Sequence, residues 1–309
     1  MLEEELVNAA RRGELSTIST LLKRDDININ QYEQRWTALA YACFFDFIQI
    51  VELLLNDPRI DVNMGLIDGT SPLFLACQEG HLEIVKMLLK DKRVQVNQTS
   101  AEGSTPLIIA CLERRADVVK ELLSLAPLVD VNQSIGEGVT AFFIACDEDY
   151  FEIVRLLANN PYVDVNKAKV EGTTPFYIAC QMGCLEIIQY LLQVDRVDVN
   201  KGMNKGEVPL FVACQNGAYE IVQFLLVSGK VDTTPKADRK QGLEFAFEYD
   251  LDLDKKLYEA AKGDYVSVID AAELLQHYEV SNLLRRYDED KEKTIKELRE
   301  ELGLTGNIN

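Results

Sequence analysis

The sequence is short of the residues on which several classes of protein depend. It has one Trp and two His, and 51 Asp and Glu outnumber 32 Lys and Arg, which gives a net charge of −19. Because Lys and Arg supply the affinity for phosphates, this balance argues against nucleic acid or an anionic membrane surface as the main partner. The sequence has no nucleophile-elbow, phosphate-loop or zinc-protease motif, so it predicts neither an enzyme nor a cofactor.

Long apolar runs are also missing. No run reaches the roughly 18 residues that a transmembrane helix needs. The acidic start, Met1 to Glu5, lacks the basic and apolar regions of a signal peptide. Apolar residues still make up 47% of the chain, which is enough to bury a core. We therefore expect a soluble cytoplasmic protein, with the nucleus as an open alternative.

The length of 309 residues suggests two domains at about 150 residues each, but the cysteines indicate otherwise. Six of them stand 34 or 35 residues apart: Cys43, Cys77, Cys111, Cys146, Cys180 and Cys214. A second series keeps step with them: Asn30, Asn63, Asn97, Asn132, Asn166 and Asn200. Two series with one period indicate an internal repeat, which replaces the two-domain interpretation.

Each copy of the repeat predicts two short helices. Ser71, Thr105 and Thr174 stand where they can cap the first helix, and Pro follows each of them. In copy two, apolar residues at helical spacing from Leu82 to Leu89 predict the second helix. A polar connection that contains Val-Asn then leads to the next copy.

Copy two, from Gly69-Thr70-Ser71-Pro72-Leu73 to Leu88-Leu89, carries a family pattern. It resembles the ankyrin repeat, and the resemblance covers about residues 31–235 as six copies. The resemblance implies an all-α ankyrin-repeat solenoid of stacked helix–turn–helix units with short β-hairpin fingers and a helical C-terminal cap. Residues 1–30 resemble a truncated, N-terminal capping repeat.

The chain departs from the family pattern at two positions. The usual His of the first helix is replaced throughout by apolar or aromatic residues: Phe74, Ile108, Phe143, Tyr177 and Phe211. We expect packing to replace a hydrogen bond there. The usual Gly between the helices is Asp46, Arg114 and Asp149 in copies one, three and four. A left-handed backbone costs Gly little, is tolerable for Asp and strains Arg, which predicts weak points in copies three and four.

The cysteines and histidines are interpreted as structural. Equivalent positions on stacked helices lie about 8–10 Å apart, whereas a disulfide needs Cα atoms within about 7 Å. The series therefore predicts buried, reduced thiols. Cys180 and Cys184 are four residues apart but lack companion ligands, so no metal site is predicted. His81 matches the family's Gly-His turn, and His277 stands at the same turn of a later unit.

The last third of the chain has its own organisation. Residues 236–265 are predicted to be an insertion in which acidic and apolar residues alternate over 243–254, which is typical of a strand or of a partner-binding segment. A helix is predicted over 255–262, followed by a degenerate terminal repeat over 266–288. Residues 289–309 form a tail with a helix from Thr294 to Leu302, with Thr294 and Glu297 as its capping box and Gly303 as its stop. This helix would cap the last apolar face or dock onto another protein.

The resemblance implies that the concave groove of the stack binds a partner protein. The positions that match the family's groove are Trp36, Phe44, Phe45, Asp68, Glu79, Leu112, Glu113, Asp147, Glu148, Gln181, Met182, Glu207, Gln215 and Asn216. Acidic residues far outnumber basic ones at such positions, so a basic partner would be steered to the groove. The alternative is that the carboxylates only keep the stack soluble.

Trp36, Phe44 and Phe45 form a candidate anchor, because exposed aromatic residues are enriched at binding hot spots. Alternatively, the first unit or its finger covers them.

We therefore expect a non-catalytic scaffold or adaptor that binds a protein and needs no metal or cofactor. Two alternatives stay open: a regulatory module whose insertion and tail mask the groove, and an effector or inhibitor of a host or cellular protein. A monomer is expected, although the sequence leaves the oligomeric state, the partner and the pathway open.

Overall fold

The computed structural model describes residues 2–238 and 264–304. The chain divides into two compact units: unit one is Met1–Ala145 with Asn159–Val163, and unit two is Cys146–Ala158 with Asp164–Asn309. Both units consist mainly of short helices that follow one another in pairs. The predicted segments at 243–254 and 255–262 lie outside the described residues.

Unit one contains four helix pairs and a small hairpin. The pairs are α1 (Leu2–Arg12) with α2 (Leu15–Leu21), α3 (Ala38–Phe44) with α4 (Ile48–Leu55), α5 (Pro72–Glu79) with α6 (Leu82–Lys90), and α7 (Pro106–Leu112) with α8 (Ala116–Leu123). The hairpin is β1 (Ser134–Ile135) with β2 (Val139–Thr140), in which Ser134 pairs with Thr140. The pair α9 (Ala141–Asp147) and α10 (Phe151–Asn159) carries the division between the units.

Unit two continues the alternation of first and second helices. Its elements are α11 (Pro175–Met182), α12 (Leu185–Leu191), α13 (Pro209–Gln215), α14 (Tyr219–Val227), β3 (Lys236–Asp238), β4 (Tyr265–Ser267), α17 (Val268–Leu274), α18 (Tyr278–Glu289) and α19 (Lys291–Glu301). The strands β3 and β4 pair antiparallel, with Ala237 opposite Val266.

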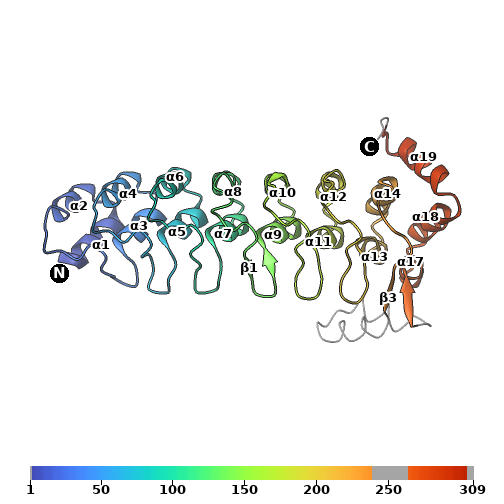
Figure 1. The fold of residues 1–309 in the computed structure, drawn as a ribbon, viewed down its shortest axis with the longest axis horizontal. Helices are drawn as coiled ribbons and strands as arrows, with labels where there is room; N and C mark the ends of the chain where they lie inside the picture. The colour runs from blue at the N-terminus through green and yellow to red at the C-terminus, as the bar shows by residue number, and fades with distance from the viewer. Residues whose placement is uncertain (1, 239–263, 305–309) are drawn as a thin grey trace. The chain divides into compact units, whose positions relative to one another are not determined.

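Within each unit the helices form two rows. In unit one the first helices contact one another in the order α1, α3, α5, α7, and α2, α4, α6 and α8 form the second row. In unit two, α11, α13 and α17 form one row, and α12, α14 and α18 lie beside them. The fingers hang from the side of the first row (Figure 1). Apolar residues fill the space between the rows, and all seven cysteines are buried and free, as the sequence predicts.

The predicted helix starts are confirmed. The hydroxyls of Ser71, Thr105 and Thr174 accept hydrogen bonds from the amides of the third residue of α5, α7 and α11, and Pro opens each helix. Thr37 caps α3 in the same way. Such caps satisfy amides that have no partner inside the helix.

The residue between the paired helices is left-handed, as predicted. The φ angle is 81° at Gly80 and stays positive where Gly is missing: 60° at Asp46, 54° at Arg114 and 56° at Asp149. A Cβ atom makes this conformation costly, so the backbone is strained at these three turns.

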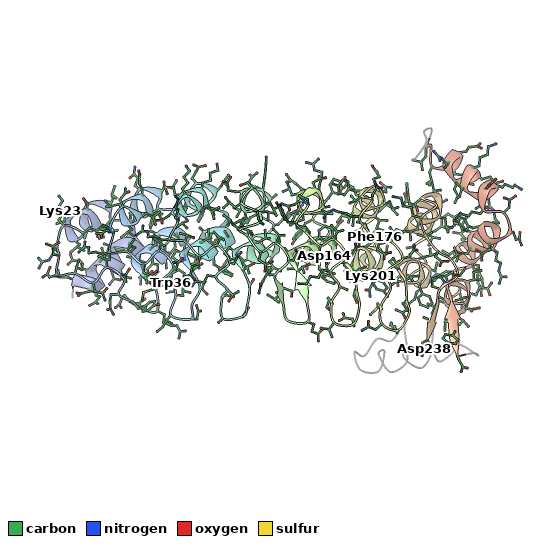
Figure 2. The ribbon with its side chains drawn as sticks, in the orientation of Figure 1. Lys23, Trp36, Asp164, Phe176, Lys201 and Asp238 are labelled. Carbon is green, nitrogen blue, oxygen red and sulfur yellow. The ribbon has the colours of Figure 1, made fainter. Side chains whose placement is uncertain are left out.

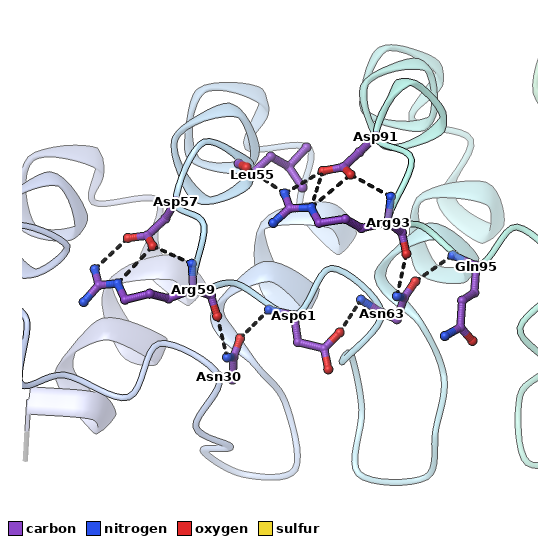
Figure 3. A network of polar contacts seen from close by, with 9 residues as sticks. All are labelled: Asn30, Leu55, Asp57, Arg59, Asp61, Asn63, Asp91, Arg93 and Gln95. Carbon is purple, nitrogen blue, oxygen red and sulfur yellow. Dashed lines mark hydrogen bonds and ion pairs between the residues drawn. The ribbon is translucent and has the colours of Figure 1, made fainter.

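The Asn series ties neighbouring repeats together through paired hydrogen bonds. In unit one, the Asn63 amide donates to the carbonyl of Arg93 at 2.8 Å and its oxygen accepts from the amide of Gln95 at 2.7 Å. Asn30 repeats the arrangement with Arg59 and Asp61 (Figure 3). This pair of hydrogen bonds from one Asn side chain to the next connection is here called the Asn bracket, and it accounts for the regular Asn spacing.

Packing replaces the family's His, as expected, but one position keeps a polar contact. Phe74, Ile108, Phe143 and Phe211 are buried. Tyr177 is also buried, yet its hydroxyl donates to Glu207 of the next finger at 2.9 Å.

The last repeat-like pair, α17 and α18, ends in a polar surface. Ser267 caps α17 in a capping box with Asp270. Glu273 stands where the earlier repeats have the buried Cys, and Arg285 stands at a leucine position of the second helix. The two side chains form an ion pair and are half exposed. An ion pair in place of Cys and Leu gives the final face to water, as an end repeat requires.

The predicted start and capping box of the last helix are wrong. The helix α19 begins at Lys291, and the carboxylate of Asp290 caps it by accepting from the Lys293 amide at 3.0 Å. The hydroxyl of Thr294 donates instead to the carbonyl of Arg286, because the helix begins one turn earlier than predicted. Leu298 is fully buried against α14 and α18, and Gly303 is left-handed just beyond the helix.

Candidate partner-binding face

The surface formed by the finger residues and the last residues of the first helices is here called the finger face. In unit one it carries the predicted residues Phe45 and Leu112, which are 45% and 40% exposed. Asp68 and Glu113 are exposed as well, whereas Trp36, Phe44 and Glu79 are half-buried. Trp36 lies on the finger side of the first helices (Figure 2).

In unit two the predicted residues divide into accessible and buried ones. Glu148, Gln181, Met182 and Asn216 are exposed, with Met182 at 57%. Asp147 is half-buried. Burial, and after it repulsion from Glu148, raises the pKa of the Asp147 carboxyl. The finger face of unit two therefore carries two consecutive carboxylates and, one repeat later, a long exposed apolar side chain.

Glu207 and Gln215 do not lie on an open surface, contrary to the sequence-based expectation. Glu207 is 1% exposed and forms an ion pair with Lys205 at 2.9 Å. Gln215 is 3% exposed. The amide of Asp238 in β3 donates to the carbonyl of Lys205 at 2.9 Å, so β3 extends the finger that contains the ion pair. This pairing could not be predicted from the sequence, because Asp238 is remote from Lys205 along the chain.

Five aromatic rings gather at the start of the finger face of unit one. Trp36 stacks on Tyr41 with centroids 4.8 Å apart and meets the edge of Phe44 at 5.3 Å. Phe45 lies parallel to Tyr41 at 6.2 Å and also contacts Phe47. The exposed member of the cluster is Phe45 rather than Trp36. Tyr41 was not among the residues predicted for this face, although its spacing of four residues from Phe45 places both on one helix face.

Several carboxylates of the finger face are available to a partner. Among the residues that the structure describes, the exposed Glu113 and Glu148 and the half-buried Glu79 have no ion-pair partner. Asp68 accepts from the Thr70 amide, which is the main reason that its pKa is lowered. Free carboxylates in water are stable without a partner, and they attract cationic groups over the range set by the salt concentration.

The two histidines make structural hydrogen bonds, as predicted. His81 Nε2 lies 2.9 Å from the carbonyl oxygen of Phe44 in unit one, and His277 Nε2 lies 3.0 Å from that of Gln215 in unit two. Arg115 makes the equivalent contact from its Nε to the carbonyl of Gln78 at 3.0 Å. These bonds hold the end of each first helix to the turn of the next repeat.

The thiols are poor nucleophiles. Burial raises the pKa of Cys43, Cys77 and Cys180. Burial together with nearby acidic groups raises the pKa of Cys184 to about 12, and its thiol points at the carbonyl of Cys146. Since the thiolate is the reactive form, these groups stay protonated near neutral pH.

Comparison with known proteins agrees with the fold. A family model described as ankyrin repeats (three copies) matches residues 6–100, 58–135, 92–169 and 142–237. The chain belongs to the ankyrin-repeat family. Ankyrin repeats are generally protein–protein interaction modules and are typically non-catalytic.

A solved structure shows the same ankyrin fold. The crystal structure of the ankyrin repeat domain of Bcl-3, a member of the IkappaB protein family, has a TM-score of 0.65 and 20% identity, and the match covers 72% of this chain and 97% of that one. The search of curated proteins finds no significant match. Among the helices that the structure describes, none combines the length and apolar character needed to span a membrane.

Proposed function

We propose that this ankyrin-repeat chain is a non-catalytic scaffold or adaptor that binds a basic protein partner through its finger face. The observation that carries the proposal is that carboxylates without an ion-pair partner and exposed apolar side chains occur together on this face. In unit one, Glu113 follows Leu112, which is 40% exposed. In unit two, Met182 is 57% exposed on the face that carries Glu148.

The two kinds of side chain have different roles in binding. Carboxylates at the rim raise the rate at which a basic surface finds the face, and they do so less at high salt. Apolar side chains at the centre of an interface supply most of the affinity when they are covered. A face that has both suits a partner with basic residues around an apolar anchor.

An affinity pulldown with mass spectrometry tests this proposal. The variant Glu113→Lys/Glu148→Lys reverses two exposed charges of the finger face, and Glu52→Lys/Asp117→Lys makes the same change of net charge on the exposed surface of the second helices. We expect the first variant to lose partners that the wild type and the second variant retain. Recovery of the same proteins with all three chains would contradict recognition by the finger face.

A second candidate function is regulation, in which the chain from β3 onward masks part of the finger face. The observation in its favour is the burial of Lys205 and Glu207, at 5% and 1% exposure, in the finger that β3 extends. The finger one repeat earlier also carries an ion pair, at other positions of the repeat, between Lys169 and Glu171, and it is more exposed, with side chains at 23% and 18%.

Shortening the chain tests the masking function. A chain that ends at Pro235 lacks β3, whose Asp238 amide donates to the carbonyl of Lys205, and everything that follows it. Masking predicts that this shortened chain binds the captured partner more tightly than the wild type does. Equal affinities, measured for chains with equal thermal stability, would refute masking.

A further inference from the structure

Phe45 is a half-exposed aromatic ring on a rigid support. It lies parallel to Tyr41, with an interplanar angle of 3°, and its neighbour Phe44 meets it edge-on at 5.0 Å. Tyr41 is itself only 8% exposed, so the rings beneath Phe45 are fixed in the body of unit one. Phe45 nevertheless stays 45% exposed, which leaves part of its ring available to a partner.

One carboxylate follows this ring in the sequence, and a second stands at the matching position of the next repeat. Asp46 is the next residue and its side chain is 48% exposed, with Oδ1 3.8 Å from Nδ1 of His81. Glu79 occupies the position of Phe45 in the next repeat, and its helix α5 packs on α3. The imidazole of His81 connects the two repeats, because its Nδ1 faces Asp46 and its Nε2 contacts the carbonyl of Phe44.

The basic residue of the same finger does not neutralise this pair. Arg35 lies in the turn of finger one, and its charge acts on Asp68. Among the described residues, Glu79 has no ion-pair partner. The exposed ring, the exposed carboxylate of Asp46 and the half-buried carboxylate of Glu79 thus lie at the ends of two packed helices of unit one.

We propose that Phe45, Asp46 and Glu79, here called the Phe45 site, bind an arginine side chain of the partner protein. The proposal rests on the proposed function and names the group that the partner presents to this face. A guanidinium is planar and weakly hydrated, so it can lie on an aromatic ring while its N–H groups bond to carboxylates. A lysine ammonium is more strongly hydrated and lacks the planar fork, so it fits this combination less well.

The combination does not recur at the equivalent positions of the other repeats. The position of Phe45 is occupied by Glu79, Glu113, Glu148, Met182 and Asn216 in the following copies. Met182 is 57% exposed but has no ring, which makes it a matched control for the loss of exposed apolar surface. The site therefore distinguishes repeat one from the rest of the chain.

The single Trp provides a direct readout. Trp36 contacts Tyr41 and Phe44, the two rings that support Phe45, so its emission reports on this cluster and on no other place in the chain. The probe is a blocked Gly/Ser peptide with one Leu and one Arg. Its twins carry citrulline, which keeps the shape of Arg without its charge, or Lys in the same place.

We expect the Arg peptide to change the emission of Trp36 and to bind at least about fivefold more tightly than the citrulline peptide, since a cation over a ring contributes about 1 kcal/mol. The Lys peptide should fall between them. Phe45→Ala and Asp46→Asn should each weaken the Arg peptide by about fivefold, while Met182→Ala leaves it unchanged. Phe45→Leu keeps the apolar bulk without the ring, so it tests the ring even if Phe45→Ala disturbs the fold.

Equal affinities for the Arg and citrulline peptides would overturn the arginine site, as would full affinity in Phe45→Leu and Asp46→Asn. No binding of the Arg peptide at millimolar concentration would also overturn it. These results are separate from the charge-reversal pulldown. If the peptide does not bind but the charge-reversed variant loses partners in the pulldown, the Phe45 site alone is refuted. If the Arg peptide binds but the pulldown is unaffected by charge reversal, the proposed function of the finger face as a protein-binding surface is refuted.

Discussion

The bracket formed by Asn63 gives a prediction that can be checked at a single amide. In the variant Asn63→Ala, the carbonyl of Arg93 and the amide of Gln95 lose their partner, at present 2.8 and 2.7 Å away. A hydrogen bond contributes about 1 kcal/mol net, and less where water can replace it. Because the bracket is on an exposed connection, we expect the free energy of unfolding to fall by about 1–2 kcal/mol.

Hydrogen exchange of the Gln95 amide is the sharper assay. The loss of one bond of about 1.4 kcal/mol should speed its exchange by about tenfold, measured by NMR under native conditions. Asn97→Ala is the matched control, because Asn97 accepts from the amide of Asp130 at 2.8 Å in the next connection. It should speed exchange at Asp130 and leave Gln95 alone. If Asn63→Ala left the Gln95 amide as protected as before, the bracket would not be a stabilising contact.

Three further predictions concern strain, charge and pH. Residues 114 and 183 are left-handed, with φ angles of 54° and 80°. Arg114→Gly should therefore raise the free energy of unfolding of unit one by about 1 kcal/mol, and Gly183→Ala should lower that of unit two by about as much. Urea unfolding followed by circular dichroism measures both changes. Glu207→Gln breaks the buried ion pair with Lys205 and should cost about 3–5 kcal/mol in the same assay, with more than half of that recovered when Lys205→Met is added. A hydrogen bond from a neighbouring arginine lowers the pKa of Asp57, so its stabilisation is present above the ordinary Asp pKa and is lost as the pH falls through the lowered one. Asp57→Asn should therefore flatten the loss of thermal stability below about pH 4 relative to the wild type, and parallel curves would contradict this.

Local features were readable from the sequence because each depends on a few neighbouring residues. The caps of α5, α7 and α11 need only Ser or Thr before Pro. The left-handed turns at Asp46, Arg114 and Asp149 followed from their alignment with Gly, because the repeat imposes one backbone on every copy. The start of α19 was mistaken because Thr294 and Glu297 have capping-box spacing, whereas Asp290 in fact caps the helix.

The finger face could be predicted as a set of positions but not as a surface. The repeat predicted the finger residue Glu207 and the helix-end residue Phe45 to lie on one open face, yet one is 1% exposed and the other 45%. Their difference arises from contacts with residues outside their own repeat. Tyr177 donates to Glu207 from one side and β3 extends its finger on the other, whereas nothing comparable covers Phe45 in the described part of unit one.

The sequence by itself determined the repeat, the family, the placement of the cysteines in the core and the acidic charge, because these follow from periodicity and composition. Only the tertiary structure decided which groove positions stay accessible, since burial depends on what packs over a residue rather than on its place in the period. It also showed that Phe45 is exposed and that the helix carrying Glu79 packs on the helix before Phe45, which requires two repeats to be stacked. The sequence gives the negative charge only as a total for the chain, whereas the structure shows which carboxylates form ion pairs and which do not.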